Sequence, residues 1–334
     1  MTITGLGPHG EHASAPERVL LLPEDLARSR TAEFRVAIAL HTTVSDWAKQ
    51  LQAGLVGTLG GAGVAVIEVA DCAFTSDVQI EALDRMIQNA PDAIVSLPVA
   101  NAKVADAHKR IAAGGIKLIL LDNVPTGLLP AKDYVSLISA DNFGLGKMAA
   151  ESLSAHVAYG ATVGMLAYDA DFFATNEREI AFIKWMQINR PDIRLVTRRF
   201  SEVSEAGRST RVLLDELPAM EGLFVVWDTP ATEAAKVIVA AGRAVSIATI
   251  DLGKAAAIEL AAGGVLVSVA AQQPFRLGQT AASATVTALL GRILPAWVAL
   301  PGIPVTPDNV VESFQAIWQS PAPRELLLRK RLIE

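Results

Sequence analysis

Short apolar runs that alternate with helical patterns are the feature that most constrains the fold of this chain. The runs are rich in valine, isoleucine, leucine and alanine, which is typical of strands buried on both faces. They cover residues 35–40, 64–69, 93–96, 117–121, 135–140, 162–166, 194–197, 223–226, 246–250 and 265–270. Helical patterns lie between nearly all of them, for example over residues 48–59, 77–88, 174–189 and 231–241. This predicts an α/β fold with doubly wound parallel sheets, and ten strands are enough to indicate two lobes.

One passage from strand to helix, residues 139–153 with the sequence SADNFGLGKMAAESL, is the reference point from which the other predicted elements are placed. Ser139 lies near the end of a predicted strand. Asp141 and Asn142 then supply an N-cap for a helix whose apolar face is rich in alanine. The passage therefore predicts the first half of a parallel β-α-β unit.

A group of glycines, Gly57, Gly60, Gly61 and Gly63, invites comparison with a nucleotide-binding loop. They stand after a predicted helix and before a strand, whereas a phosphate-binding loop lies between a strand and the following helix. We therefore expect them to end the helix. Neither G-x-x-x-x-G-K-[ST] nor G-x-S-x-G occurs in the sequence.

Composition and charge exclude several classes of protein. The 334 residues carry a formal charge of −6, and Lys and Arg cluster only at residues 324–331, so a nucleic-acid surface is not expected. No apolar run approaches the roughly 18 residues of a membrane helix. Cys72 is the only cysteine, which excludes an intrachain disulfide and a cysteine zinc site. His9 and His12 lie in a Gly/Pro-rich leader, where we expect neither metal nor cofactor.

Polar and aromatic side chains follow the predicted strands, at the edge where open α/β sheets bind ligands. Basic residues are few among them, and no histidine stands beside a serine or cysteine nucleophile. Carboxylates and amides can bind hydroxyl groups while aromatic faces cover C–H surface, so the set suits a neutral polyhydroxy compound. The residues are Ser45, Asp46, Trp47, Asp122, Asn123, the loop 168–176, Trp227, Asp228, Asp251 and Gln272.

From residue 35 to about 314, the chain resembles the sugar-binding type I solute-binding proteins. These are relatives of the ribose and xylose binding proteins and of the effector domains of lactose-repressor-like regulators. The resemblance rests on residues 47–54, 77–87 (DVQIEALDRMI), 121–123, 139–153, 176–182, 226–231 (VWDTPA), 249–253 and 271–278 (AQQPFRLG). It implies two Rossmann-like lobes joined by three crossings, and no enzymatic activity.

The resemblance also implies roles for single residues. Trp47 matches an aromatic that stacks on the sugar ring, Asp122 and Asp251 match two hydroxyl-binding carboxylates, and Gln272 matches the amide at the last crossing. The ligand-binding residues predicted in this way are Ser45, Asp46, Trp47, Asp122, Asn123, Asn176, Trp227, Asp251 and Gln272.

The sequence departs from the family pattern at several of these positions. Asn123 and Asn176 stand where the family often has arginine, and Trp227 replaces a common binding asparagine. Arg178 matches an arginine that is usually structural. Because of these departures, the sequence does not identify the sugar. Smaller or more reduced ligands, such as sugar alcohols, are also compatible with it.

Structural roles compete with binding roles for several residues. Asp141, Asp228 and Asp251 can each cap a following helix, and Trp47 can be a core or interface residue. The acid pairs allow a comparison with glycosidases, but nothing marks one of them as a proton donor. We expect Trp185, Trp297 and Trp318 to be packing residues.

The lobes are expected to divide the chain unequally. The N-lobe is predicted from residues 35–137 and 273–302, and the C-lobe from residues 138–272 with the tail 303–334. Residues 1–34 are expected to be a mobile leader.

We expect the protein to be a monomer that captures a sugar or sugar alcohol by hinge closure. It would deliver this ligand to the membrane permease of an ABC transporter. The alternative is a cytoplasmic sugar-sensing regulator with the same fold. A DNA-binding helix-turn-helix domain takes roughly 50–60 residues, and only 34 residues precede Arg35.

The resemblance implies a periplasmic location. Residues 1–33 contain one short apolar run, 19–22, which is shorter than the apolar core of roughly 7–15 residues in a secretion signal. Three explanations stay open: a start further upstream, a trimmed leader, or a cytoplasmic protein.

Overall fold

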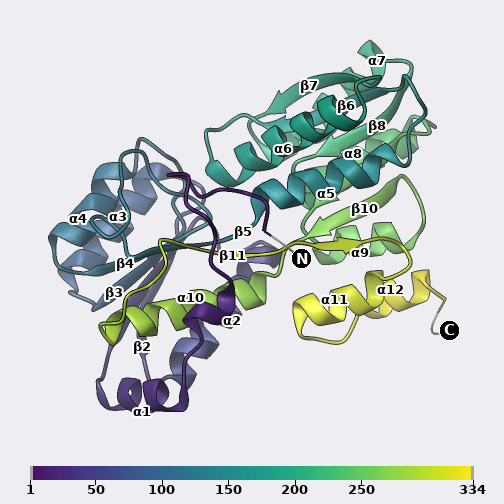
Figure 1. The fold of residues 1–334 in the computed structure, drawn as a ribbon. Helices are drawn as coiled ribbons and strands as arrows, with labels where there is room; N and C mark the ends of the chain where they lie inside the picture. Colours follow the sequence, from purple (N-terminus) through teal and green to yellow (C-terminus); the bar gives the residue numbers. More distant parts are fainter. Residues whose placement is uncertain (1–2, 332–334) are drawn as a thin grey trace.

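Two six-stranded sheets form the framework of the protein. The structure is a computed structural model, and it describes residues 3–331. In the first sheet the strand order is β11-β5-β4-β3-β1-β2, and in the second it is β12-β10-β9-β8-β6-β7. Figure 1 shows the two sheets in separate lobes, each with helices packed on it. The predicted pair of doubly wound lobes is confirmed.

The first lobe is the part of the chain that belongs to or packs on the first sheet. It contains β1 (Arg35–Leu40), α2 (Asp46–Gly61), β2 (Ala65–Asp71), α3 (Ser76–Gln88), β3 (Ala93–Ser96), α4 (Ala105–Ala113), β4 (Lys117–Leu121), β5 (Ser136–Ala140), α10 (Pro274–Leu289) and β11 (Trp297–Leu300). Ahead of it stand η1 (Pro16–Val19) and α1 (Pro23–Thr31).

The second lobe is defined in the same way by the second sheet. It contains α5 (Asn142–Ser154), β6 (Thr162–Tyr168), α6 (Phe173–Asn189), β7 (Arg194–Phe200), η2 (Val203–Glu205), α7 (Ala206–Glu216), β8 (Met220–Val225), α8 (Asp228–Ala240), β9 (Ser246–Ile250), α9 (Lys254–Ala261), β10 (Leu266–Ala271), β12 (Ile303–Val305), α11 (Val310–Trp318) and α12 (Arg324–Arg329).

The ten predicted strands are all present, with ends that differ by no more than three residues. β11 and β12 were not predicted. β11 has four residues, and β12 has three with a proline in the middle, so neither makes a recognisable apolar run. β12 pairs with β10 antiparallel, while the other pairings within the two sheets are parallel. An edge position is where a sheet tolerates proline.

Strand β1 shows why the sheets are buried on both faces. Val36, Ile38 and Leu40 enter the apolar core formed with α2 and α10, while Ala37 and Ala39 enter the core on the opposite face. Alternate side chains of a strand point to opposite faces, so a continuous apolar run is required when helices cover both. The same reasoning applies to the other central strands.

Side-chain caps begin two of the helices that lead away from the ligand edge of the sheets. The Ser45 hydroxyl accepts from the Ala48 N–H at 3.2 Å to begin α2, and the Asp141 carboxylate accepts from the Gly144 N–H at 2.9 Å to begin α5. The cap predicted at Asp141 is confirmed. Gly60, Gly61 and Gly63 behave as predicted, since α2 ends at Gly61 and Gly63 follows with a φ of 75°, whereas Gly57 lies inside the helix.

The leader differs from expectation, because residues 3–34 pack on the body of the protein. Ser14 joins the edge of the first sheet beside β11: its N–H donates to Trp297 and its carbonyl accepts from Ala299, at 2.9 and 3.1 Å. The N–H groups of Thr4 and Gly5 donate to the Asp141 carboxylate. The free edge of β11 has backbone N–H and C=O groups that need hydrogen-bond partners, and the leader supplies them. The composition of the leader does not reveal this pairing.

Three connections carry the chain between the lobes. They join β5 to α5, β10 to α10, and β11 to β12. The whole of β5 lies in the first sheet, where it pairs with β11 as far as Ala140, so the first crossing follows Ala140 and not residue 137 as expected. The remaining lobe limits, near residues 272 and 302, stay predictions. Within the described residues, no helix is both long and apolar enough to cross a membrane.

We expect residues 137–141, 270–274 and 302–306 to act as hinges, because only segments that cross between lobes can absorb the backbone change of closure. In the structure the lobes touch across the cleft. The Lys254 N–H donates to the Asp46 carboxylate at 3.3 Å, and the Phe173 N–H donates to the Asn123 amide oxygen at 3.1 Å. Small-angle scattering should show a particle that becomes more compact with ligand. Identical profiles with and without saturating ligand would contradict hinge closure.

Candidate ligand-binding site

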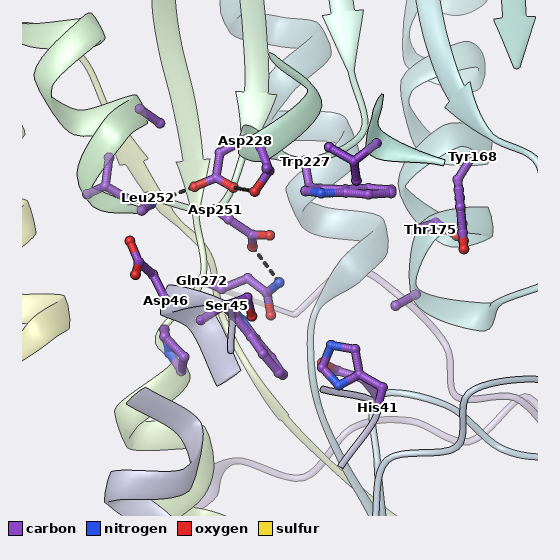
Figure 2. Close-up of a pocket in the computed structure, with 18 of the residues that line it drawn as sticks. His41, Ser45, Asp46, Tyr168, Thr175, Trp227, Asp228, Asp251, Leu252 and Gln272 are labelled. Carbon is purple, nitrogen blue, oxygen red and sulfur yellow. Dashed lines mark hydrogen bonds between the residues drawn. The ribbon is translucent and has the colours of Figure 1, made fainter. Parts of the chain in front are cut away.

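A cavity of about 670 Å³ lies between the lobes, at the carboxyl ends of the strands in both sheets. It is reached by the loops after β1, β2, β3, β4, β6, β7, β8, β9 and β10. In both sheets the strand order reverses beside the first strand of the lobe, and this reversal is where open α/β sheets place their ligands. Figure 2 shows side chains from both lobes pointing into the cavity. The volume is typical of small-molecule sites.

Asp122 and Asp251 occupy equivalent positions in the two lobes, directly after β4 and β9. Both have left-handed backbone conformations, with φ of 51° and 72°. Such conformations cost free energy in residues other than glycine and are concentrated at functional sites. The Asp122 carboxylate accepts from the Ala140 N–H at 3.1 Å, and the Asp251 carboxylate accepts from the Gln272 amide at 2.6 Å. These bonds hold both carboxylates at the cavity.

Among residues 3–331, Arg178 is the one arginine that lines the cavity. Its guanidinium donates to the Asn142 side chain at 2.9 Å and to the Val226 carbonyl at 3.1 Å, and it lies 3.9 Å from an Asp251 oxygen. The structural role implied for it by the family agrees with the first two contacts, and the third adds an electrostatic role. Burial raises the pKa of Asp122 to about 6, against the lowering effect of Arg178.

Asp228 and Asp251 form a closely interacting pair of carboxyl groups. Burial raises the pKa of each, and the negative charge of Asp251 raises that of Asp228 further. The competing interpretation, that Asp228 caps the helix following it, is wrong: Asp228 is the first residue of α8, and its carboxylate accepts from the Gly253 N–H at 2.6 Å, where α9 begins. In Figure 2 Asp228, Asp251 and Gln272 lie together on one side of the cavity.

This pair predicts a specific dependence of stability on pH. A carboxyl group whose folded-state pKa is raised binds protons more tightly in the folded protein, so it destabilises the fold as the pH rises above the ordinary aspartate value of about 4. Between pH 5 and 8 the ligand-free protein should therefore lose stability relative to Asp228→Asn. Urea unfolding at several pH values measures this, and parallel curves for the two proteins would contradict it. The other charged or titratable groups that line the cavity are His41, Asp46, Asp122, Tyr168, Arg178, Glu202 and Asp251.

Aromatic side chains form the walls. The Trp227 ring packs edge-on against Tyr168, with ring centres 5.2 Å apart, and is tilted against Phe200. Trp47 lies edge-on to His41 at 5.7 Å. Burial lowers the pKa of His41 to about 4, so the imidazole is neutral near pH 7. These rings are held by their neighbours and offer flat surfaces to a ligand.

Three buried polar atoms at the cavity have no hydrogen-bond partner in the protein: His41 Nδ1, Trp47 Nε1 and Gln272 Oε1. A buried polar group without a partner costs about 1–3 kcal/mol, so such groups are normally satisfied by water or by a ligand. Their presence at one cavity makes it the candidate ligand-binding site.

Seven of the nine predicted site residues line the cavity. They are Ser45, Asp46, Trp47, Asp122, Trp227, Asp251 and Gln272. The binding roles of these residues remain predictions.

Asn123 and Asn176 do not line the cavity. Both polar atoms of the Asn123 amide have partners: its nitrogen donates to the Pro98 carbonyl, and its oxygen accepts from the Phe173 N–H. Asn176 donates to Asp171 on the outer side of the loop. Hydrogen bonds within the protein therefore occupy both side chains; those of Asn123 are long-range, and that of Asn176 is local.

Other lining residues were not among the predicted ligands. Among them are His41, Tyr168, Thr175, Arg178 and Asp228, together with Trp318. His41 follows β1 directly, so the rule that selected Ser45 and Trp47 could have included it. Trp318, expected to be a packing residue, both packs on Phe314 and reaches the cavity.

A family model described as a periplasmic binding protein domain matches residues 36–293. The chain belongs to the periplasmic binding protein family. This family consists of solute-binding transport proteins and not of enzymes.

Among curated periplasmic binding proteins, the chain is similar to the ribose import binding protein of Bacillus subtilis (strain 168), with 24% identity over 80% of this chain and 86% of that protein. A similar solved structure is an Agrobacterium vitis ABC transporter solute-binding protein with bound α-D-tagatopyranose (TM-score 0.79, 21% identity, 87% and 100% covered). An Agrobacterium radiobacter carbohydrate transporter protein in complex with D-arabinose is also similar (TM-score 0.77, 19% identity, 86% and 99% covered). These likenesses to solved structures establish the type I fold.

The tryptophans of this periplasmic binding protein give an optical test of the site. Ligand should change the intrinsic fluorescence, and Trp47→Phe and Trp227→Phe should each reduce that change, because both indoles line the cavity. Trp185→Phe and Trp297→Phe are matched controls that should retain most of it. Trp297 is buried in the first lobe, where its N–H donates to Ser139 at 2.7 Å. A cleft variant with the full signal and affinity would show that its tryptophan only packs.

Proposed function

We propose that the protein captures a sugar or sugar alcohol in the cleft and presents it to the permease of an ABC transporter. The observation that carries this proposal is the cavity itself. Carboxylates from both lobes and an amide converge there between aromatic walls, which is the arrangement that hydroxyl groups and C–H faces require. The names of the similar proteins, which mention ribose, tagatose and arabinose, support this ligand class.

The proposal includes a periplasmic location and a monomer without catalytic activity. The family supports the location, and the transport roles of the similar proteins favour a transporter component over the cytoplasmic regulator. A DNA mobility-shift assay at low salt separates the two, since specific retardation would favour the regulator.

A thermal-shift screen over pentoses, hexoses and polyols, neutral and amino-substituted, tests the proposal. A ligand that binds only the folded state at 100 times its Kd stabilises by about 2.7 kcal/mol. At least one compound should raise the melting temperature, and calorimetry should then show one site per chain. If no member of the panel raised it, the proposed function would be overturned.

A further inference from the structure

The buried part of the cleft carries more negative than positive charge. Asp122 and Asp228 are 4% and 8% exposed, and the side chain of Asp251 is 13% exposed. Arg178, 5% exposed, is the single basic group opposite these three carboxylates, and His41 is neutral near pH 7. Buried carboxylates without full compensation are costly, so they either retain protons or attract a cation.

Arg178 does not neutralise the pair formed by Asp228 and Asp251. Its hydrogen bonds go to Asn142 and to the Val226 carbonyl, and it approaches Asp251 only to 3.9 Å. The nearest donors to Asp228 are neutral, namely the Gly253 N–H at 2.6 Å and the Thr229 hydroxyl at 3.2 Å. A second positive charge is therefore missing from this end of the cavity.

Gln272 supplies an independent indication of what fits there. It is 3% exposed, and its amide nitrogen donates to Asp251 while its oxygen has no partner. Figure 2 shows this side chain beside Asp251 inside the cavity. Two carboxylates and an amide oxygen can only accept hydrogen bonds, and an ammonium group, with up to three donors and a positive charge, matches them.

The other surroundings favour an organic cation over a metal ion. Among residues 3–331, no three His, Cys, Asp or Glu side chains are grouped so that they could hold a metal ion. The Trp227 ring lines the same cavity as Asp251, and aromatic faces attract ammonium groups.

We propose that the ligand is an amino sugar or amino polyol whose protonated amine is held by Asp228, Asp251 and the Gln272 oxygen. The hydroxyl groups and C–H faces of the same ligand occupy the rest of the cavity between Trp47 and Trp227. This inference rests on the proposed function and narrows its ligand class. The sequence alone suggested that the carboxylates bind neutral hydroxyl groups. In this proposal some of them bind the positive charge of the amine.

Matched pairs of compounds test the inference by calorimetry at pH 7.5. The pairs are D-glucose with D-glucosamine, D-galactose with D-galactosamine, and D-sorbitol with 1-amino-1-deoxy-D-sorbitol. In at least one pair the amine should bind at least tenfold more tightly than its neutral partner. N-acetyl-D-glucosamine and N-acetyl-D-galactosamine, which keep the nitrogen but lose the charge, should lose that advantage.

Variants locate the charge recognition. Asp228→Asn should reduce the preference for the amine, measured as the ratio of its affinity to that of the neutral partner, at least fivefold. Glu81→Gln, exposed on α3, alters the net charge by the same unit and should leave both affinities unchanged. Circular dichroism confirms that each variant is folded before titration.

The outcomes separate this inference from the proposed function. Equal or tighter binding of the neutral partner in every pair overturns the amine inference and leaves sugar capture standing. An amine preference that Asp228→Asn does not reduce overturns the assignment to this carboxylate pair. Binding of no compound in the panel overturns both.

Discussion

Asp251→Ala is expected to weaken binding of the ligand at least about tenfold. A hydrogen bond to a charged group contributes roughly 1.5–3 kcal/mol, and 1.4 kcal/mol corresponds to a factor of ten in Kd. Asp251 follows β9, lines the cavity and is oriented by Gln272, so its loss removes an acceptor at the centre of the site. Titration calorimetry on the variant measures the effect, and an unchanged affinity would remove Asp251 from the site.

Asp251→Asn separates binding from folding. Asparagine tolerates the left-handed conformation of this position, with its φ of 72°, better than alanine does. Because burial raises the pKa of Asp251, replacing the carboxylate by an amide should keep or increase the stability of the ligand-free protein near neutral pH. A variant with weaker binding and undiminished melting temperature is therefore expected, whereas joint loss of both would indicate a structural role.

Gly54→Ala is expected to destabilise the first lobe by several kcal/mol or to prevent its folding. Helices α2 and α10 pack so closely that a methyl group on Gly54 would overlap the Phe275 carbonyl oxygen, and one on Gly278 would overlap the Leu51 carbonyl oxygen. Backbone atoms on two packed helices cannot move aside without separating the helices. Overpacking of a well-packed core typically costs about 1–3 kcal/mol, and overlap with backbone lies at or above the upper end of this range.

Gly57→Ala is the matched control in the same helix. Nothing lies within 4 Å of a methyl group built on Gly57, so only helix propensity changes. Alanine in a helix interior is more favourable than glycine by roughly 0.5–1 kcal/mol, so this variant should be slightly more stable. Urea unfolding of both variants measures the contrast. Equal stability of the two would contradict the close approach of α2 and α10.

The sequence predicted the framework because the framework depends on local patterns. Apolar runs covered on both faces, such as β1 and β4, are visible as continuous hydrophobic stretches. The cap at Asp141 is a property of the chain within a few residues. β11 and β12 were missed because they are short and depend on β5 and β10, strands far away in the sequence.

The site was predictable to the extent that it follows from topology. Asp122, Trp227 and Asp251 lie at the cavity because each stands within two residues of the end of a strand. Asn123 follows the same strand as Asp122, but its side chain pairs with a backbone group of the other lobe, which no local rule reveals. The docking of the leader on β11 and at Asp141 is also a long-range contact. In each case the hydrogen-bond partner that the folded protein provides, and not the residue type, determines where the side chain or segment lies.

A crystal structure of the protein with the tightest compound from the thermal-shift screen tests the central claim most directly. The account predicts one ligand in the cavity between the lobes, with Trp47 and Trp227 against its faces and Asp122, Asp251 and Gln272 within hydrogen-bonding distance of its polar groups. A ligand bound outside this cavity, with the cleft filled only by water, would contradict the account.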